Sequence, residues 1–328
     1  MDNRADTKNA GTVARTGATR GTSPEGKPAA NARPGKGRRI AFYGFGVVYL
    51  LLLAFQSPLL LVVLGWFLEE PGIQAHRVHE ISFGAFFALS LVGLLVQFRR
   101  PESKIAPAYQ MVLPITVGIV AVLVVEQIDP FVLVFFVLPM GIVALHPAGR
   151  RLWRPSIHPS VAMLVMAGVL FAPLAFFSVS ELRVGLAAKD VFPRIENTVD
   201  EDASVKEFER AVARETSNPE EQLAAEHYGH WSVMAAFAVT ICLLAVVAGL
   251  RPKGWRITAW SAGAAAAYFG AASIAFPFNA SSVGRIGGTL LIIWGVSFVA
   301  LAWRESEPAP APSLSGEPAP RRVSGRRE

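Results

Sequence analysis

Residues 226–250 read EHYGHWSVMAAFAVTICLLAVVAGL, so a glutamate and two histidines precede 20 residues without a charged side chain. A helix rises about 1.5 Å per residue, and roughly 20 apolar residues cross a bilayer core that is about 30 Å thick. The stretch therefore predicts a transmembrane helix over 231–250, with His227 and His230 at the end where the chain enters the membrane.

Seven further apolar runs lie along the chain of 328 residues, of which 52% are hydrophobic. The eight predicted spans are 42–68, 79–98, 108–125, 131–145, 161–179, 231–250, 257–276 and 286–303. Residues 1–39 and 305–328 are polar and low in complexity, so we predict that they form disordered tails before and after a membrane domain over 40–304. The fold class is an all-α integral membrane protein with eight transmembrane helices.

The basic residues predict the orientation of the spans, because short cytoplasmic loops are enriched in Lys and Arg. Bases gather in both tails and in the connections at 99–104, 150–154 and 251–256. The alternate connections are acidic or nearly uncharged, and the longest of them, 180–226, has 12 acids and 6 bases. This pattern predicts a multi-pass protein of the cell membrane, with both termini cytoplasmic and the loop 180–226 outside.

The net charge of +6 also occurs in nucleic-acid-binding proteins, but here the bases are spread over the inner connections without a recognition motif. We therefore predict the lipid bilayer as a partner, and no nucleic acid. The outer loop 180–226 offers a surface to a protein partner. Within it, residues 203–216 predict a short amphipathic helix with Val205, Phe208 and Val212 on one face.

An internal repeat is indicated at an offset of 151 residues. Two pairs of histidines and two Arg-Pro steps fall in register: His76 with His227, His79 with His230, and 100–101 with 251–252. Each half holds four spans, so we predict two parallel four-helix repeats, about 40–147 and 159–304, related by an axis along the membrane normal. The alternative is that any outer helix end, one membrane thickness from an inner turn, gives a similar spacing.

The histidine pairs and their neighbouring carboxylates form the candidate site. On a helix, residues three and four apart share a face, as His76, His79 and Glu80 do. Imidazole and carboxylate groups bind copper, zinc and iron, and imidazoles alone hold haem iron. The predicted metal ligands are His76, His79, Glu80, Glu226, His227 and His230, and the four histidines are also the candidate ligands of haem. If the second and sixth spans meet, these groups converge on the outer face.

Three alternatives remain open beside metal or haem handling. The histidines fit a purely structural role at the level of the lipid headgroups. Prolines within several spans, among them Pro58, Pro114, Pro139 and Pro173, suggest kinked helices around a cavity, as in a permease for a neutral or apolar solute. A non-catalytic scaffold that meets a partner through loop 180–226 is the third. We do not expect an enzyme, because no nucleophile, phosphate loop or intramembrane acid constellation is seen.

A proton relay or charge-coupled transporter is also not expected, because the predicted spans place no ionisable side chain at bilayer depth. The other functional interpretations are structural. His146 and His158 flank an Arg-rich inner turn and are expected to contact headgroups, and Cys242 is expected to be a small apolar filler. Small residues in the last two spans, including Gly288 and Gly295, predict faces for close helix packing.

The number of spans, the inner termini and the histidines that open spans two and six are similar to those of haem A synthase. In that family, eight spans form two four-helix halves with outer histidines on the even-numbered helices. The outer ends of spans four and eight, at Phe131 and Arg285, carry no histidine here. The paired ligands within each half are therefore missing, and the likeness does not extend to the ligand set.

Overall fold

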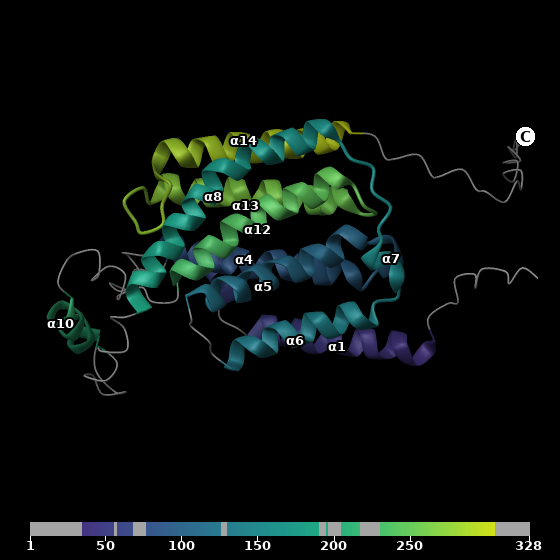
Figure 1. Ribbon diagram of the computed structural model, residues 1–328, viewed down its shortest axis with the longest axis horizontal. Coiled ribbons are helices and arrows are strands. Elements are labelled where there is room, and N and C mark those ends of the chain that lie inside the picture. Colours follow the sequence, from purple (N-terminus) through teal and green to yellow (C-terminus); the bar gives the residue numbers. More distant parts are fainter. Residues whose placement is uncertain are drawn as a thin grey trace, which may run out of the picture. The chain divides into compact units, whose positions relative to one another are not determined.

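The computed structural model describes residues 35–55, 58–67, 77–125, 130–189, 195, 205–216 and 230–305, and the regular structure in these ranges is helical (Figure 1). Six stretches are long and apolar enough to cross a membrane: Lys36–Leu64, Arg77–Gln97, Ile105–Val124, Val161–Ala187, His230–Leu250 and Gly284–Arg304. The first of these runs over residues 56–57, which lie outside the described ranges. The chain is therefore a helical, multi-pass membrane protein by length and composition.

The helices follow the predicted spans closely. They are α1 (Lys36–Phe55), α2 (Pro58–Leu64), α4 (Arg77–Gln97), α5 (Ile105–Val124), α6 (Pro130–Leu145), α8 (Val161–Lys189), α12 (His230–Leu250), α13 (Trp255–Ala275) and α14 (Gly284–Arg304). A short helix, α7 (Arg150–Trp153), lies in the connection between α6 and α8. Helix α1 begins at Lys36, six residues before the predicted start of the first span at Phe42, and so includes the basic residues Lys36, Arg38 and Arg39.

Two of the eight predicted spans, α6 and α13, are not among the six. Helix α6 has 16 residues, which corresponds to about 24 Å and is short for a bilayer core of about 30 Å. Helix α13 has 21 residues but is rich in Ala, Gly and Ser, so it is less apolar than its neighbours. The count of eight spans is therefore not established by helix length and composition.

Helix α8 corrects the predicted end of the fifth span. It continues through Lys189, ten residues beyond Val179, so the first part of the predicted outer loop is helical. The apolar run is broken there by Glu181 and Arg183, which made the sequence look like the start of a loop. The helical periodicity nevertheless continues, because Leu174, Ser178 and Glu181 are buried at spacings of four and three residues.

Helices α4, α5, α12 and α13 pack against one another and form the centre of the membrane domain. Helix α8 packs against α12 and α14 against α13, while α2 packs against α4 and α1 against α6 (Figure 1). Helix α12 lies within the main apolar cluster, where Phe237, Ile241 and Leu244 are fully buried. Cys242 is buried in the same cluster, as predicted for a small apolar filler.

Helices α13 and α14 approach each other through two pairs of glycines, as their small residues predicted. A methyl group on Gly270 would lie 2.3 Å from the carbonyl oxygen of Gly288, and one on Gly295 would lie 2.3 Å from that of Gly263. Real carbon–oxygen contacts are longer, so only residues without a side chain fit at these positions.

Helix α10 (Val205–Glu215) agrees with the amphipathic helix predicted over 203–216. Ala211 and Val212 on its apolar side are buried, whereas Glu207 and Arg210 are exposed. The later part of the predicted outer loop, 217–229, lies outside the described residues.

His146 does not contact headgroups as expected, because its side chain is fully buried at the end of α6. Its Nδ1 accepts a hydrogen bond of 3.1 Å from the backbone N–H of Ala148, so its Nε2 donates to Oε1 of Gln97 at 2.9 Å. Arg38 closes the same end of α6 by donating to three backbone carbonyls, those of residues 144–146. His158, by contrast, is exposed.

The buried His146 is expected to make stability depend on pH. Burial lowers its pKa from 6.5 to about 4, an effect that Glu102 opposes and Arg38 reinforces. The unfolded chain then binds a proton below pH 6.5 that the folded chain binds only near pH 4. The contribution of neutral His146 to the free energy of unfolding is therefore complete above pH 6.5 and decreases as the pH falls towards 4. At pH 5 the free energy of unfolding should be lower by roughly 2 kcal/mol.

The measurement is the apparent Tm of the detergent-purified protein at pH 7.5 and pH 5, for the wild type and for His146→Gln. Glutamine keeps an acceptor and a donor but does not titrate, so the Tm of the variant should fall less between the two pH values. Equal falls in the two proteins would contradict the assignment of this pH dependence to His146.

Candidate functional site

Three of the six predicted ligands lie in the described residues, and the structure places them at one end of the central helices. His79 and Glu80 are in the first turn of α4, and His230 is the first residue of α12. The other three, His76, Glu226 and His227, lie outside the described residues. The site can therefore be built from half of the predicted set.

His79 and His230 come together although they are 151 residues apart. Their rings meet edge to face, with centroids 5.6 Å apart and an angle of 82° between the planes. Trp231 covers another side of His79, with ring centroids 5.0 Å apart. The meeting of spans two and six that the sequence suggested is thus present in the packing of α4 against α12.

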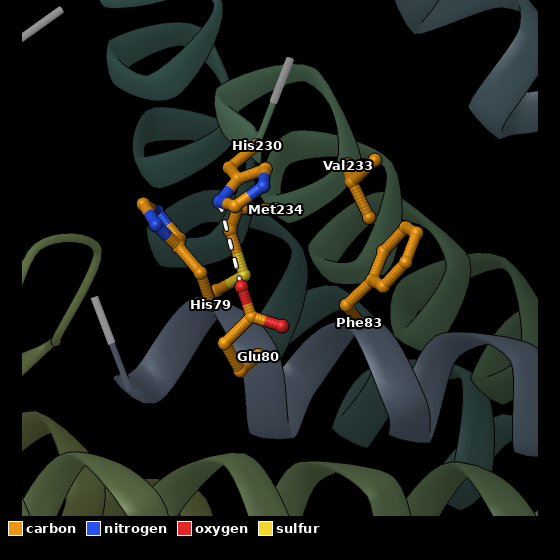
Figure 2. Close-up of a pocket in the computed structure, with 6 residues that line it drawn as sticks. All are labelled: His79, Glu80, Phe83, His230, Val233 and Met234. Atoms are coloured by element: carbon orange, nitrogen blue, oxygen red, sulfur yellow. Dashed lines mark ion pairs between the residues drawn. The ribbon is translucent and has the colours of Figure 1, made fainter. Parts of the chain in front are cut away.

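Glu80 lies close to His230. Its Oε1 lies 3.9 Å from Nδ1 of His230, which is an ion-pair distance if the imidazole is protonated but too long for a hydrogen bond (Figure 2). The Glu80 side chain is 15% exposed and that of His230 is 41% exposed, so this part of the site reaches the surface.

The sequence interpretation missed two polar residues on the other side of His79. Ser281, in the connection between α13 and α14, donates a hydrogen bond to Oε2 of Glu181 and is hydrogen-bonded to Nε2 of His79. Nε2 of His79 and Oε2 of Glu181 are 3.9 Å apart, so the hydroxyl bridges them. The side chains of His79 and Glu181 are 2% and 8% exposed.

Glu181 belongs to the stretch Val161–Ala187, which is long and apolar enough to cross a membrane. The sequence interpretation placed Glu181 in the outer loop because it ended the fifth span at Val179. The spacing from Leu174 through Ser178 to Glu181 was the signal for a longer helix, whereas nothing in the sequence singled out Ser281.

His79, Glu80 and His230 line a small cavity together with Phe83, Val233 and Met234 (Figure 2). Its volume is about 10 Å³, which is the space of about one water molecule. Among the described residues, no three His, Cys, Asp or Glu side chains are arranged to hold a metal ion.

Two further features recur at the same offset of 151 residues. Nε2 of Gln110 on α5 donates to Oγ of Ser261 on α13 at 2.9 Å, and these residues are also 151 apart. Arg100 and Arg251 follow α4 and α12, and each has the left-handed backbone, with φ of 57° and 51°. In a duplicated chain, contacts at one fixed offset would be expected next to the two-fold axis.

The sequence matches no known protein family, no curated protein and no solved structure. Function is therefore inferred from the geometry of this site.

Proposed function

We propose that this chain is a multi-pass membrane protein that binds one transition-metal ion where α4 and α12 begin. His79 and His230 are the imidazole ligands and Glu80 is a carboxylate ligand. The observation that carries the proposal is the meeting of the two imidazole rings, 5.6 Å apart, with a carboxylate oxygen 3.9 Å from the second ring.

The chemistry of the groups narrows the class of ion. Imidazole and carboxylate ligands suit Zn²⁺, Cu²⁺ and Fe²⁺, whereas Mg²⁺ and Ca²⁺ prefer oxygen ligands alone. A cavity of about 10 Å³ has space for an ion but not for a porphyrin. Between the ion and haem, both of which the sequence suggested, the geometry favours the ion.

Coordination requires the side chains of His230 and Glu80 to turn, while the helices and the His79 ring bonded to Ser281 stay in place. Metal–nitrogen bonds are about 2.0–2.1 Å long, so each ring has to direct a nitrogen at the space between them, and for His79 this nitrogen is Nδ1. The proposal keeps His76, His227 and Glu226 as further ligands. Each precedes the start of α4 or α12 by no more than four residues.

We also propose that the chain has eight spans in two parallel repeats. Both termini then lie in the cytoplasm, and this site lies on the outer face of the cell membrane. The contacts His79–His230 and Gln110–Ser261, both at an offset of 151, support the repeat. The basic residues of the connections after α4, α6 and α12 support the orientation. In this topology, α10 lies in the outer loop, and its exposed polar side, which carries Glu207 and Arg210, is available to a protein partner.

A cavity of about 420 Å³ lies between α8 and α14, and Pro173 is part of its lining. A cavity lined by a helix proline is what the permease alternative predicted. The lining is apolar apart from Ser297. Val169, Leu290 and Ile293 in the lining are 65%, 61% and 57% exposed, so the cavity opens on the flank of the two helices. This position suits contact with lipid chains better than a path between the two faces of a membrane.

The experiment is a calorimetric titration of the metal-free, detergent-purified protein with Zn²⁺. One ion per chain should bind to the wild type. A His158→Ala variant should bind equally well, because His158 is an exposed histidine in the connection before α8. Failure of the wild type to bind Zn²⁺, Cu²⁺ or Fe²⁺ would remove the proposed function.

A further inference from the structure

Three separate elements meet at Nε2 of His79. Helix α4 contributes His79, helix α8 contributes Glu181, and the connection between α13 and α14 contributes Ser281. All three side chains are at least nine-tenths buried, and the hydroxyl of Ser281 lies between the imidazole and the carboxylate. Buried polar groups in this arrangement hold one another in a fixed orientation.

The backbone of Ser281 is adapted to this position. Its φ is 57°, in the left-handed region that residues other than glycine rarely adopt. The neighbouring Ser282 does not bridge these groups, since its hydroxyl donates to the carbonyl of Ser273 at 3.2 Å. An unfavourable backbone conformation at a residue that joins two ionisable groups is typical of a functional position.

The hydrogen bonds determine which nitrogen of His79 carries the proton. A hydroxyl has a single hydrogen, and Ser281 donates it to Glu181. The Ser281 oxygen can then only accept from His79, so Nε2 of His79 carries a hydrogen, and in the neutral ring Nδ1 is the nitrogen with the lone pair. A metal ion needs that lone pair.

We infer that Ser281 and Glu181 are positioning residues for the metal site, which hold His79 as the Nε2–H tautomer and make Nδ1 its ligand atom. This inference rests on the proposed function for its metal-binding part. Metal-binding histidines commonly donate their second N–H to a carboxylate or another acceptor, which fixes the ring and strengthens the ligand. Here the hydroxyl of Ser281 transmits that contact from a buried carboxylate on a different helix.

The first experiment is ¹⁵N NMR of metal-free protein labelled at its histidines, with the His79 signals assigned through a His79→Gln variant. The ¹⁵N shifts of His79 should report Nε2–H in the wild type. They should report a mixture of tautomers in Ser281→Gly, which removes the hydroxyl at a position whose backbone suits glycine. Ser282→Ala is the matched control in the same connection and should leave the His79 signals unchanged.

The second experiment is the Zn²⁺ titration of the same proteins. Ser281→Gly is expected to bind Zn²⁺ about 10- to 100-fold more weakly, as is usual when such a partner is removed, and Ser282→Ala should bind as the wild type does. Glu181→Gln keeps an oxygen for Ser281 but removes the charge, so its affinity should fall about 10-fold. The apparent Tm of each variant separates these effects from loss of folding.

The outcomes distinguish the two proposals. If the wild type binds no ion while the His79 tautomer changes in Ser281→Gly as expected, the proposed function fails and the positioning of His79 stands. If the wild type binds Zn²⁺ and Ser281→Gly changes neither the affinity nor the tautomer, the inference is overturned and the proposed function stands. An Nδ1–H tautomer in the wild type would also overturn the inference.

Discussion

Replacing His79 and His230 together by alanine is expected to weaken Zn²⁺ binding at least about 100-fold, which corresponds to about 2.7 kcal/mol. Each substitution removes an imidazole from the same small cavity, and among the proposed ligands in the described residues only the Glu80 carboxylate is left. Each single variant should lose part of this affinity, since the other ring remains. The measurement is the calorimetric titration used for the wild type.

The two substitutions are expected to disturb folding to different extents. His79 is 2% exposed and is packed against Trp231, so its loss leaves a gap, whereas His230 is 41% exposed in its side chain. His79→Gln is therefore the companion variant, because it fills more of the space and retains a polar group. Unchanged Zn²⁺ affinity in the folded double variant would contradict the assignment of both ligands.

Replacing Gly270 by leucine is expected to prevent correct packing of α13 against α14. Even the first carbon of the new side chain would lie 2.3 Å from the carbonyl oxygen of Gly288 and 3.0 Å from Cγ1 of Ile292. The obstacle is backbone, which cannot turn away as a side chain can, so the helices have to separate. The loss of stability should exceed about 4 kcal/mol, which is at the upper end of single substitutions.

The matched control for this prediction is Gly168→Leu in α8, where no atom lies within 4 Å of the added carbon. Both variants gain the same side chain in the middle of a long helix. In size-exclusion chromatography and thermal unfolding in detergent, Gly168→Leu should behave as the wild type and Gly270→Leu should aggregate or melt far lower. Equal behaviour of the two variants would show that the α13–α14 contact is looser than described.

The positions of the helices could be predicted from the sequence because apolar runs have a required length in a bilayer. The helix starting at His230 and ending at Leu250 agrees with the predicted span to one residue. The prediction was wrong at the end of α8, since Glu181 was taken for a loop residue although its spacing from Ser178 is helical. Helices continue through a buried carboxylate when a partner such as Ser281 satisfies it.

The site itself was only partly predictable. The recurrence of a histidine pair at two helix starts suggested His79 and His230, and the packing of α4 against α12 brings their rings together. No sequence pattern pointed to Ser281. It lies in the connection between α13 and α14, which is distant in sequence from α4 and reaches His79 only in the folded chain. The orientation of the rings also depends on hydrogen bonds that no sequence pattern specifies.

A single ion shared by His79 and His230 is tested most sharply by the EPR spectrum of Cu²⁺ bound at one equivalent to the purified protein. Nitrogen hyperfine structure from imidazole should be present in the wild type and should decrease in both His79→Gln and His230→Ala. His158→Ala should leave the spectrum unchanged. Both substitutions should alter the signal of the same ion. A Cu²⁺ spectrum that shows no nitrogen ligand, or that does not change in one of the two variants, would rule out the shared site.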